Sequence, residues 1–226
     1  MNLFNLDSPF MQFLTKIADL LILNLLFIIS CIPIVTIGTA NIALYTVTLK
    51  AAKNEESYIV RGYLKAFKNN FKIGTITWLL VLLVGFILFA DFMILPGIPS
   101  PFGRILQVLT LMIFILYILM LTYLFPYIAR FENSVFGSLK NALLLAIVHF
   151  PYSLLFIAIT VLAFVASVFI NFGIVSFVWA VIGFSGLAYI NSTFFRKIFV
   201  RYEENPAEPK EDDTSCLQDG QEEEQQ

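Results

Sequence analysis

The side chains that could do chemistry are few and scattered along this sequence. It contains one histidine, His149, and two cysteines, Cys31 and Cys216. A metal site needs several His, Cys or acidic ligands at short spacing, and a nucleophilic site needs a base beside its nucleophile. Neither arrangement surrounds His149, which is better explained as a residue at the membrane interface or in a helix contact. We therefore expect no catalytic residue, metal ligand or cofactor, and predict that the protein is not an enzyme.

Four polar residues in and just after the first apolar stretch form a better candidate site. They are Asn24, Thr36, Thr39 and Asn41. One interpretation is hydrogen bonding between helices, which contributes about 0.6 kcal/mol per bond within a membrane. The other is a solute or partner site around a broken helix. The sequence favours the first interpretation and leaves the second open.

The stretch that positions these residues runs from Leu20 to Gly38 and is interrupted by Pro33. Proline lacks an N–H and disfavours helix at the residue before it, so carbonyls one turn earlier need partners from Thr36, a neighbouring helix or water. Backbone left open at membrane depth must be buried in protein or face a wet cavity. The segment either crosses the membrane once, interrupted from Pro33 to Gly38, or folds back there as a hairpin.

Composition places the chain in the membrane. Hydrophobic residues make up 59% of the 226, charged residues only 13%, and the mean hydropathy is +0.84, whereas a soluble domain is roughly one quarter charged. A spanning helix needs about 20 apolar residues. We predict an all-α polytopic bundle of about five transmembrane helices: the interrupted first segment, Ile73–Leu95, Ile105–Phe125, Ala142–Ile170 and Phe172–Ile190.

A basic amphipathic helix is predicted at about residues 57–72. Ile59, Tyr63, Phe67 and Phe71 share one face. Such a helix lies on a membrane surface, where it contacts anionic lipid head groups or docks a cytoplasmic partner. The residues expected to do so are Arg61, Lys65, Lys68 and Lys72.

The basic residues also predict the orientation. Twelve of the fourteen fall in segments on one side of the predicted spans or after the last one, so that side is expected to be cytoplasmic, together with the C-terminus. The N-terminus is outside if the first segment spans once and inside if it is a hairpin. We expect a membrane domain at 1–202 and a disordered acidic tail at 203–226, which holds ten acidic residues. No nucleic-acid partner is expected.

An ordered set of motifs is similar to one family. The motifs are Asn24-Leu25-Leu26, Cys31 to Gly38, Ala43-Leu44-Tyr45, Phe67 to Lys72, Phe125-Pro126, Ala129-Arg130-Phe131 and Leu139 to Ala142. Together they resemble the YesL family of small bacterial membrane proteins over about residues 5–200. The resemblance implies a Gram-positive cell membrane and a gene near those for sugar uptake and polysaccharide degradation. It supplies no catalytic residues.

Two functions compete at this stage. The first is a non-enzymatic accessory or regulatory component of carbohydrate uptake and utilisation, with ABC sugar permease subunits as partners; it follows from the resemblance and the basic face. The second is a small transporter or permease with a solute site at the broken first helix. Five spans are few for a monomeric carrier, so the second function requires a homo-oligomer. Copurification with a permease favours the first, and solute uptake into liposomes favours the second.

Overall fold

The structure is a computed structural model that describes residues 9–53, 58–95, 100–131, 133–169 and 172–203. Within these ranges every regular element is a helix, which confirms the all-α prediction. The elements in chain order are α1 (Pro9–Cys31), a 3-10 turn (Ile34–Thr36), α2 (Ile37–Ala52), α3 (Ile59–Asn69), α4 (Phe71–Ile94), α5 (Pro101–Arg130), α6 (Val135–Val148), α7 (Phe150–Phe169), α8 (Phe172–Val178), a π-helix (Trp179–Gly183) and α9 (Phe184–Glu203).

The helices carry extensive apolar surface of the kind that a bilayer covers. Phe86 on α4 is 70% exposed and Leu162 on α7 is 69% exposed, and many other large apolar side chains also face outward. Five helices among the described residues are long and apolar enough to cross a membrane: Phe10–Cys31, Ile34–Ala52, Phe71–Ile94, Pro101–Arg130 and Phe150–Ser167. The predicted multi-pass membrane fold is therefore confirmed. Its members differ from those expected, because the first segment supplies two helices and Phe172–Ile190 is divided among α8, the π-helix and α9.

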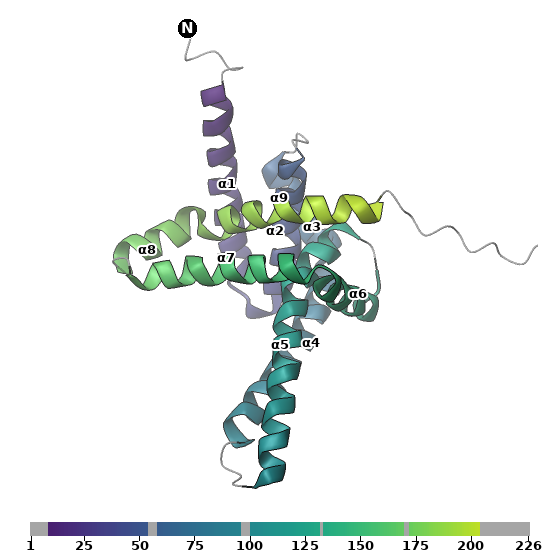
Figure 1. Ribbon diagram of the computed structural model, residues 1–226. Helices are drawn as coiled ribbons and strands as arrows, with labels where there is room; N and C mark the ends of the chain where they lie inside the picture. Colours follow the sequence, from purple (N-terminus) through teal and green to yellow (C-terminus); the bar gives the residue numbers. More distant parts are fainter. Residues whose placement is uncertain (1–8, 54–57, 96–99, 132, 170–171, 204–226) are drawn as a thin grey trace, which may run out of the picture.

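Helices α1 and α2 are the arms of a hairpin that turns around Pro33 (Figure 1). Lys16 and Leu23 of α1 line the same small hollow as Val47 and Ala51 of α2, so the start of α1 lies beside the end of α2. Of the two arrangements that the sequence left open, the structure has the hairpin.

The basic helix α3 packs on this hairpin by its apolar face. Tyr63 and Ala66 are buried in a cluster shared with α1 and α2. The helix is shorter than predicted, because Asn70 (φ −98°, ψ 9°) separates α3 from α4. The predicted start at Ser57 lies outside the described residues. The four bases Arg61, Lys65, Lys68 and Lys72 are all exposed, the last of them on α4.

Helices α4 and α5 form a second hairpin that extends away from the other helices (Figure 1). The hydroxyl of Tyr117 on α5 donates to the carbonyl of Val81 on α4 at 2.9 Å. A Cβ at Gly85 would lie 2.7 Å from that hydroxyl. Because Gly85 has no side chain, the Tyr117 hydroxyl has room to bond to the Val81 carbonyl and so links α5 to α4.

The predicted run from Ala142 to Ile170 is two helices in the structure. His149 (φ −105°, ψ 40°) leaves the helical conformation between α6 and α7. Helices α7 and α9 lie across the α4–α5 hairpin near its meeting with α2, while α8 lies at the far end of this pair (Figure 1). The crossing is packed with aromatic rings: the Phe156 and Phe195 rings stack at 4.2 Å, and Tyr123 meets Phe195 edge-on at 5.3 Å. Side chains of α2, α5, α7 and α9 thus share one core.

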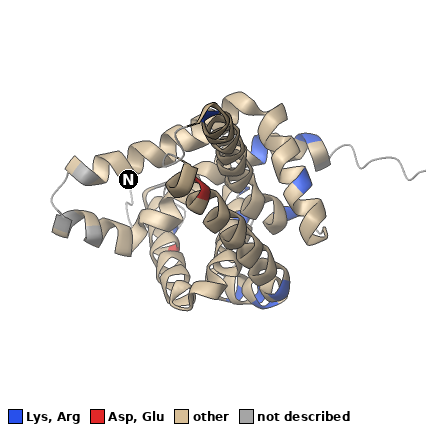
Figure 2. Cartoon of the chain, turned by 90° about the horizontal axis from the view of Figure 1, so that it is seen from below, with Lys and Arg blue, Asp and Glu red and all other residues tan. Residues whose placement is uncertain are grey.

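Charged residues are sparse over the described part of the chain (Figure 2). Its acidic positions are Asp19, Asp91 and Glu203. Figure 2 shows several basic segments close to where the grey trace leaves the last helix. The predicted acidic tail lies outside the described residues, apart from Glu203 at the end of α9.

Candidate functional site

The first predicted site residue, Asn24, joins α1 to the π-helix. Its side chain is fully buried. The Nδ2 group donates to the carbonyls of Trp179 at 3.0 Å and Ala180 at 2.8 Å, and Oδ1 accepts from the N–H of Ser185 at 3.0 Å. A π-helix changes the hydrogen-bond register of the chain and leaves backbone groups unmatched at its ends. Asn24 supplies partners for such groups, so its role here is helix pairing.

The second residue, Thr36, hydrogen-bonds to backbone carbonyls at the break itself. Its hydroxyl lies 2.7 Å from the carbonyl oxygens of both Ser30 and Pro33. Trp78 of α4 adds a second donor, because its indole N–H lies 2.8 Å from the carbonyl of Ile34. Carbonyls around the break are therefore satisfied within the protein: that of Ile29, one turn before the proline, accepts from the N–H of Ile32 at 3.3 Å, and the others accept from these side chains.

The third residue, Thr39, lies at the closest approach of α2 and α4. Its hydroxyl is 3.2 Å from that of Thr75 and 3.3 Å from the carbonyl of Phe71. A Cβ at Gly38 would lie 2.5 Å from Cβ of Trp78 and 2.6 Å from the carbonyl oxygen of Gly74. Glycine at this position is what allows the contact.

The fourth residue, Asn41, lies at a cavity. Its amide donates to the carbonyl of Ile37 in its own helix at 2.9 Å, and its side chain lines a cavity of about 340 Å³. The four predicted residues therefore contact different neighbours and do not form a single cluster. The cavity is also lined by residues of α2, α5, α7 and α9: Tyr45, Ile118, Leu121, Thr122, Phe125, Pro126, Ile157, Thr160, Val161 and Asn191.

The cavity lining includes several polar residues. Asn191 is 5% exposed, and its Oδ1 is enclosed by the protein and has no partner among the described residues, while its side chain interacts with that of Tyr45. Pro126 has no N–H, so the carbonyl of Thr122 lacks its usual partner one turn ahead in α5. The hydroxyl of Thr160 donates to the carbonyl of Phe156 at 2.9 Å, which leaves its lone pairs able to accept. A ligand that donates hydrogen bonds would suit this lining, and Asn191 would accept from it once its side chain turns toward the cavity.

The described lining of the cavity carries no charged side chain. Its polar groups are amides and hydroxyls, and the rings of Tyr45 and Phe125 add apolar faces. This chemistry suits a neutral ligand that bears hydroxyl groups beside apolar surface, and its volume falls in the range of about 300–1,000 Å³ usual for small-molecule sites. It offers no nucleophile paired with a base. Over the described ranges no group of three or more His, Cys, Asp or Glu side chains could hold a metal ion.

The structure reveals site residues that the sequence did not single out. Trp78 and Asn191 act through contacts with helices distant in the chain, and the local sequence carries no sign of those contacts. Pro126 could have been used to predict part of the site, because a proline within an apolar helix leaves the carbonyl one turn earlier without its N–H partner. His149, by contrast, lies between α6 and α7 and contacts the rings of Tyr152 and Tyr202.

Comparison with known proteins adds a family match for about one third of the chain, in its N-terminal half. The model described as "Protein of unknown function, DUF624" matches residues 20–92, a range that contains the break, α2, α3 and most of α4. The chain is 24% identical over 203 residues to "Uncharacterized protein YteU" of Bacillus subtilis (strain 168), covering 89% of this chain and 88% of that protein. No solved structure matches the chain. The YesL name remains a prediction from the motifs.

Proposed function

We propose that this integral membrane protein is a non-enzymatic accessory or regulatory component of carbohydrate uptake, and that its cavity holds one end of a neutral oligosaccharide. The observation that supports the proposal is the wall shared by α2, α5, α7 and α9, where the polar lining residues carry amides and hydroxyls and no described lining residue is charged. A sugar presents hydroxyl donors beside apolar ring faces, which complement these groups. Five membrane-spanning helices would place the site within reach of a permease in the same bilayer.

The orientation proposed for the protein places the basic surfaces in the cytoplasm. Because α1 and α2 form a hairpin, Lys16 lies near the end of α2 that carries Lys50, and Arg104 at the start of α5 then becomes the single base on the other side. The positive-inside rule favours a cytoplasmic location for both termini. A reporter fused after Arg201 is expected to behave as a cytoplasmic marker, and alkaline phosphatase activity there would contradict the orientation.

Direct binding tests the cavity. Full-length protein in nanodiscs is titrated with a panel of neutral plant oligosaccharides, and binding is followed by calorimetry. Asn191→Leu removes the buried acceptor and is expected to weaken binding at least about tenfold, since an unmatched polar partner costs about 1.4 kcal/mol or more. Asn69→Leu is the matched control, because Asn69 is exposed on α3 and remote from the cavity lining. Equal affinity of both variants for every sugar would show that the cavity is not the sugar-binding site.

A small oligomeric transporter is the second candidate, and the same cavity supports it. Three candidate spans contribute to the cavity lining, as expected of a translocation site. Its amide side chains are those of Asn41 and Asn191. Asn24, which the sequence suggested for a solute site, is not among the lining residues. Purified protein in liposomes separates the two functions. Sugar accumulation without any other protein favours the transporter, whereas binding without uptake, together with copurification of an ABC sugar permease, favours the accessory role. Growth of a deletion strain on the same sugars tests the cellular role.

A further inference from the structure

A row of exposed bases follows α3 and continues into the first turn of α4. The basic row consists of Arg61, Lys65, Lys68 and Lys72. Arg61 lies over the ring of Tyr58 at 5.7 Å, whereas the three lysines make no hydrogen bond or ion pair with a described residue. Residues 59–90 contain no acidic side chain that could neutralise them. The positive charge of the row is therefore available to a partner.

The spacing of these bases makes an anionic partner favourable. Arg61 and Lys65 are four residues apart, and so are Lys68 and Lys72. Like charges at this spacing repel each other and destabilise a helix. An anion placed along the row would relieve that repulsion, so binding it would also stabilise α3.

The opposite face of α3 is already covered by protein. Tyr63 and Ala66 are buried against the α1–α2 hairpin, and Phe67 packs on the same cluster. A helix that lies on a membrane surface inserts its apolar face among the lipids. Here Tyr63 and Phe67, the aromatic residues that would insert, contact protein instead. The basic row is thus the outward side of a docked helix, and it suits an anionic partner that approaches from the water.

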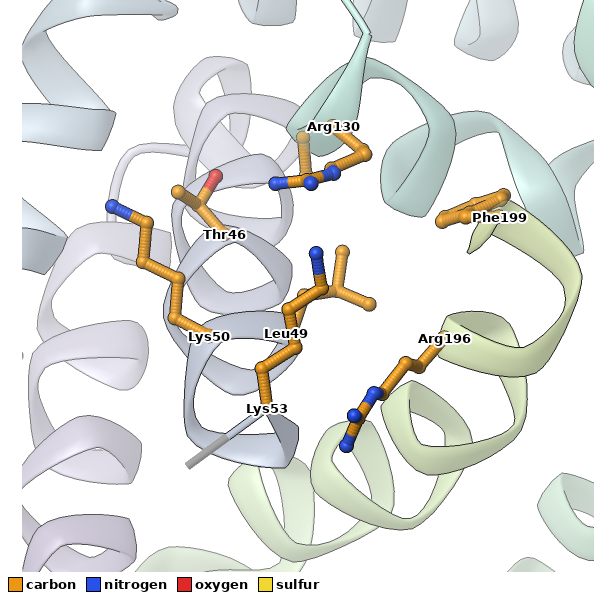
Figure 3. Close-up of a pocket in the computed structure, with 8 residues that line it drawn as sticks. Thr46, Leu49, Lys50, Lys53, Arg130, Arg196 and Phe199 are labelled. Carbon is orange, nitrogen blue, oxygen red and sulfur yellow. The ribbon is translucent and has the colours of Figure 1, made fainter. Parts of the chain in front are cut away.

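Several other bases at this end of the molecule are engaged. Arg196 of α9 extends toward the end of α2 (Figure 3), where its Nη1 donates to the carbonyl of Ala52 at 2.8 Å. Lys53 and Arg130 also have interaction partners. The lysines of the basic row differ from these three bases because they have none among the described residues.

An acidic segment of the same chain starts close to α3. Residues 204–226 contain nine acidic side chains and one base, and six of the acids form two triplets, 211–213 and 222–224. This segment directly follows α9, which lies near α3 because Tyr189 and Ile59 line the same hollow. From Tyr189 to Glu203 is about 21 Å of helix, and α3 is about 16 Å long. A fully extended chain of these 23 residues spans about 75 Å, which is enough to reach along the row.

We propose that the acidic segment 204–226 docks on the basic row of α3. Its two acidic triplets would pair with the lysines of the row. Exposed ion pairs are individually weak and are screened by salt, so several pairs must act together. The docked segment would cover the row and exclude other anionic partners from it. The proposal does not depend on the sugar cavity, whose described lining includes no residue of α3.

The distance between two spin labels tests the docking. One label is attached to the native Cys216 and the other to Asn69→Cys, an exposed position of α3. The full-length protein carries Cys31→Ala so that these are its labelled positions, and it is placed in phosphatidylcholine nanodiscs. Double electron–electron resonance then gives the ratio of docked molecules, with a short separation, to free ones. We expect the docked form to predominate at low salt and to be lost at about 1 M salt.

Paired variants locate the contact. Lys65→Gln with Lys68→Gln removes two bases of the row and is expected to lower the docked-to-free ratio at least about threefold. Lys140→Gln with Lys197→Gln is the matched control, because it removes two exposed bases of α6 and α9, and it should change the ratio less than about 1.5-fold. Converting the six acids of the two triplets to amides should lower the ratio as the first variant does.

Four outcomes would overturn the proposal. The first is the absence of a short separation in the parent protein. The second is an equal loss in both lysine pairs, which would mean diffuse attraction. The third is a short separation that persists at high salt, which would mean a contact that is not ionic. The fourth is loss of the short separation when the nanodiscs contain phosphatidylglycerol, which would assign the row to lipid.

Melting temperature is measured for every variant. If a double variant is unstable, Lys65→Gln alone is compared with Lys140→Gln by the same ratio. Sugar binding is expected to be unchanged in all of them, so failure of the docking would leave the proposed function standing.

Discussion

Two prolines, Pro33 and Pro126, interrupt the hydrogen bonding of apolar helical segments, and the backbone around them is satisfied to different degrees. At Pro33 the carbonyls of Ser30, Pro33 and Ile34 all receive donors from Thr36 or Trp78. At Pro126 the carbonyl of Thr122 lacks its helical partner, and Thr122 lines a cavity together with Asn191, whose enclosed Oδ1 has no partner among the described residues. A proline therefore does not by itself mark a binding site. What matters is whether neighbouring side chains complete the backbone that it opens.

The difference assigns distinct roles to the two regions. The Pro33 region is closed by hydrogen bonds and by tight contacts at Gly38, so it should contribute to stability. The Pro126 region retains open acceptors, so it should contribute to binding and little to stability. Substitutions in each region test whether one contributes mainly to stability and the other mainly to binding.

The largest effect is expected from Gly38→Leu. A Cβ there would lie 2.5 Å from Cβ of Trp78 and 2.6 Å from the backbone oxygen of Gly74, so α2 and α4 must separate. We expect the free energy of unfolding to fall by about 3 kcal/mol, as overpacked sites do. Unfolding in detergent measures the loss. Gly186→Ala is the control, because its nearest contact would be 3.8 Å away and its stability should be unchanged or slightly higher.

The next effect is expected from Asn24→Leu. The variant removes the donors to Trp179 and Ala180 and the acceptor for Ser185. Three interhelical bonds at about 0.6 kcal/mol each give a loss of about 2 kcal/mol. The same detergent unfolding assay detects it. A loss below about 0.5 kcal/mol would show that the π-helix needs no support from α1.

A smaller effect is expected from Thr36→Val, which keeps the shape of the side chain and removes the hydroxyl. The carbonyls of Ser30 and Pro33 lose the hydroxyl donor, although that of Pro33 keeps the N–H of residue 36 at 3.0 Å. We expect the free energy of unfolding to fall by about 1 kcal/mol. Thr193→Val is the matched control, since that hydroxyl is exposed and donates within its own helix. Equal losses in the two variants would contradict a special role for Thr36.

The smallest effect on stability is expected from Asn191→Leu. The variant loses a contact with Tyr45, and it also removes a buried acceptor that has no partner among the described residues. These changes offset each other, so the free energy of unfolding should change by less than about 0.5 kcal/mol. Sugar binding should nevertheless fall. A loss as large as that of Asn24→Leu would make the cavity wall a structural contact and end the contrast between the two regions.

Local sequence was enough to predict the membrane class, the break at Pro33, the basic helix and the part played by Thr36. Each of these depends on residues within about one helical turn, where proline, periodicity and charge act directly. The partners of Asn24 could not be predicted in the same way, because they lie 155 and 156 positions later in the chain. Asn191 and Asn41 line the same cavity because α9 packs beside α2. The local sequence carries no trace of that packing.

The bond between Asn24 and Trp179 also has a consequence for the order of synthesis. Their separation is 155 residues, and a ribosome adding about 5–20 residues per second needs roughly 8–30 s to cover it. During that interval the amide of Asn24 is already in the growing membrane protein without its final partners. The α1–α2 hairpin must then persist on its own contacts, or with help from the insertion machinery, until the last helix emerges. Asn24 is therefore a place where slow translation or a late truncation should expose an unfinished protein to quality-control proteases.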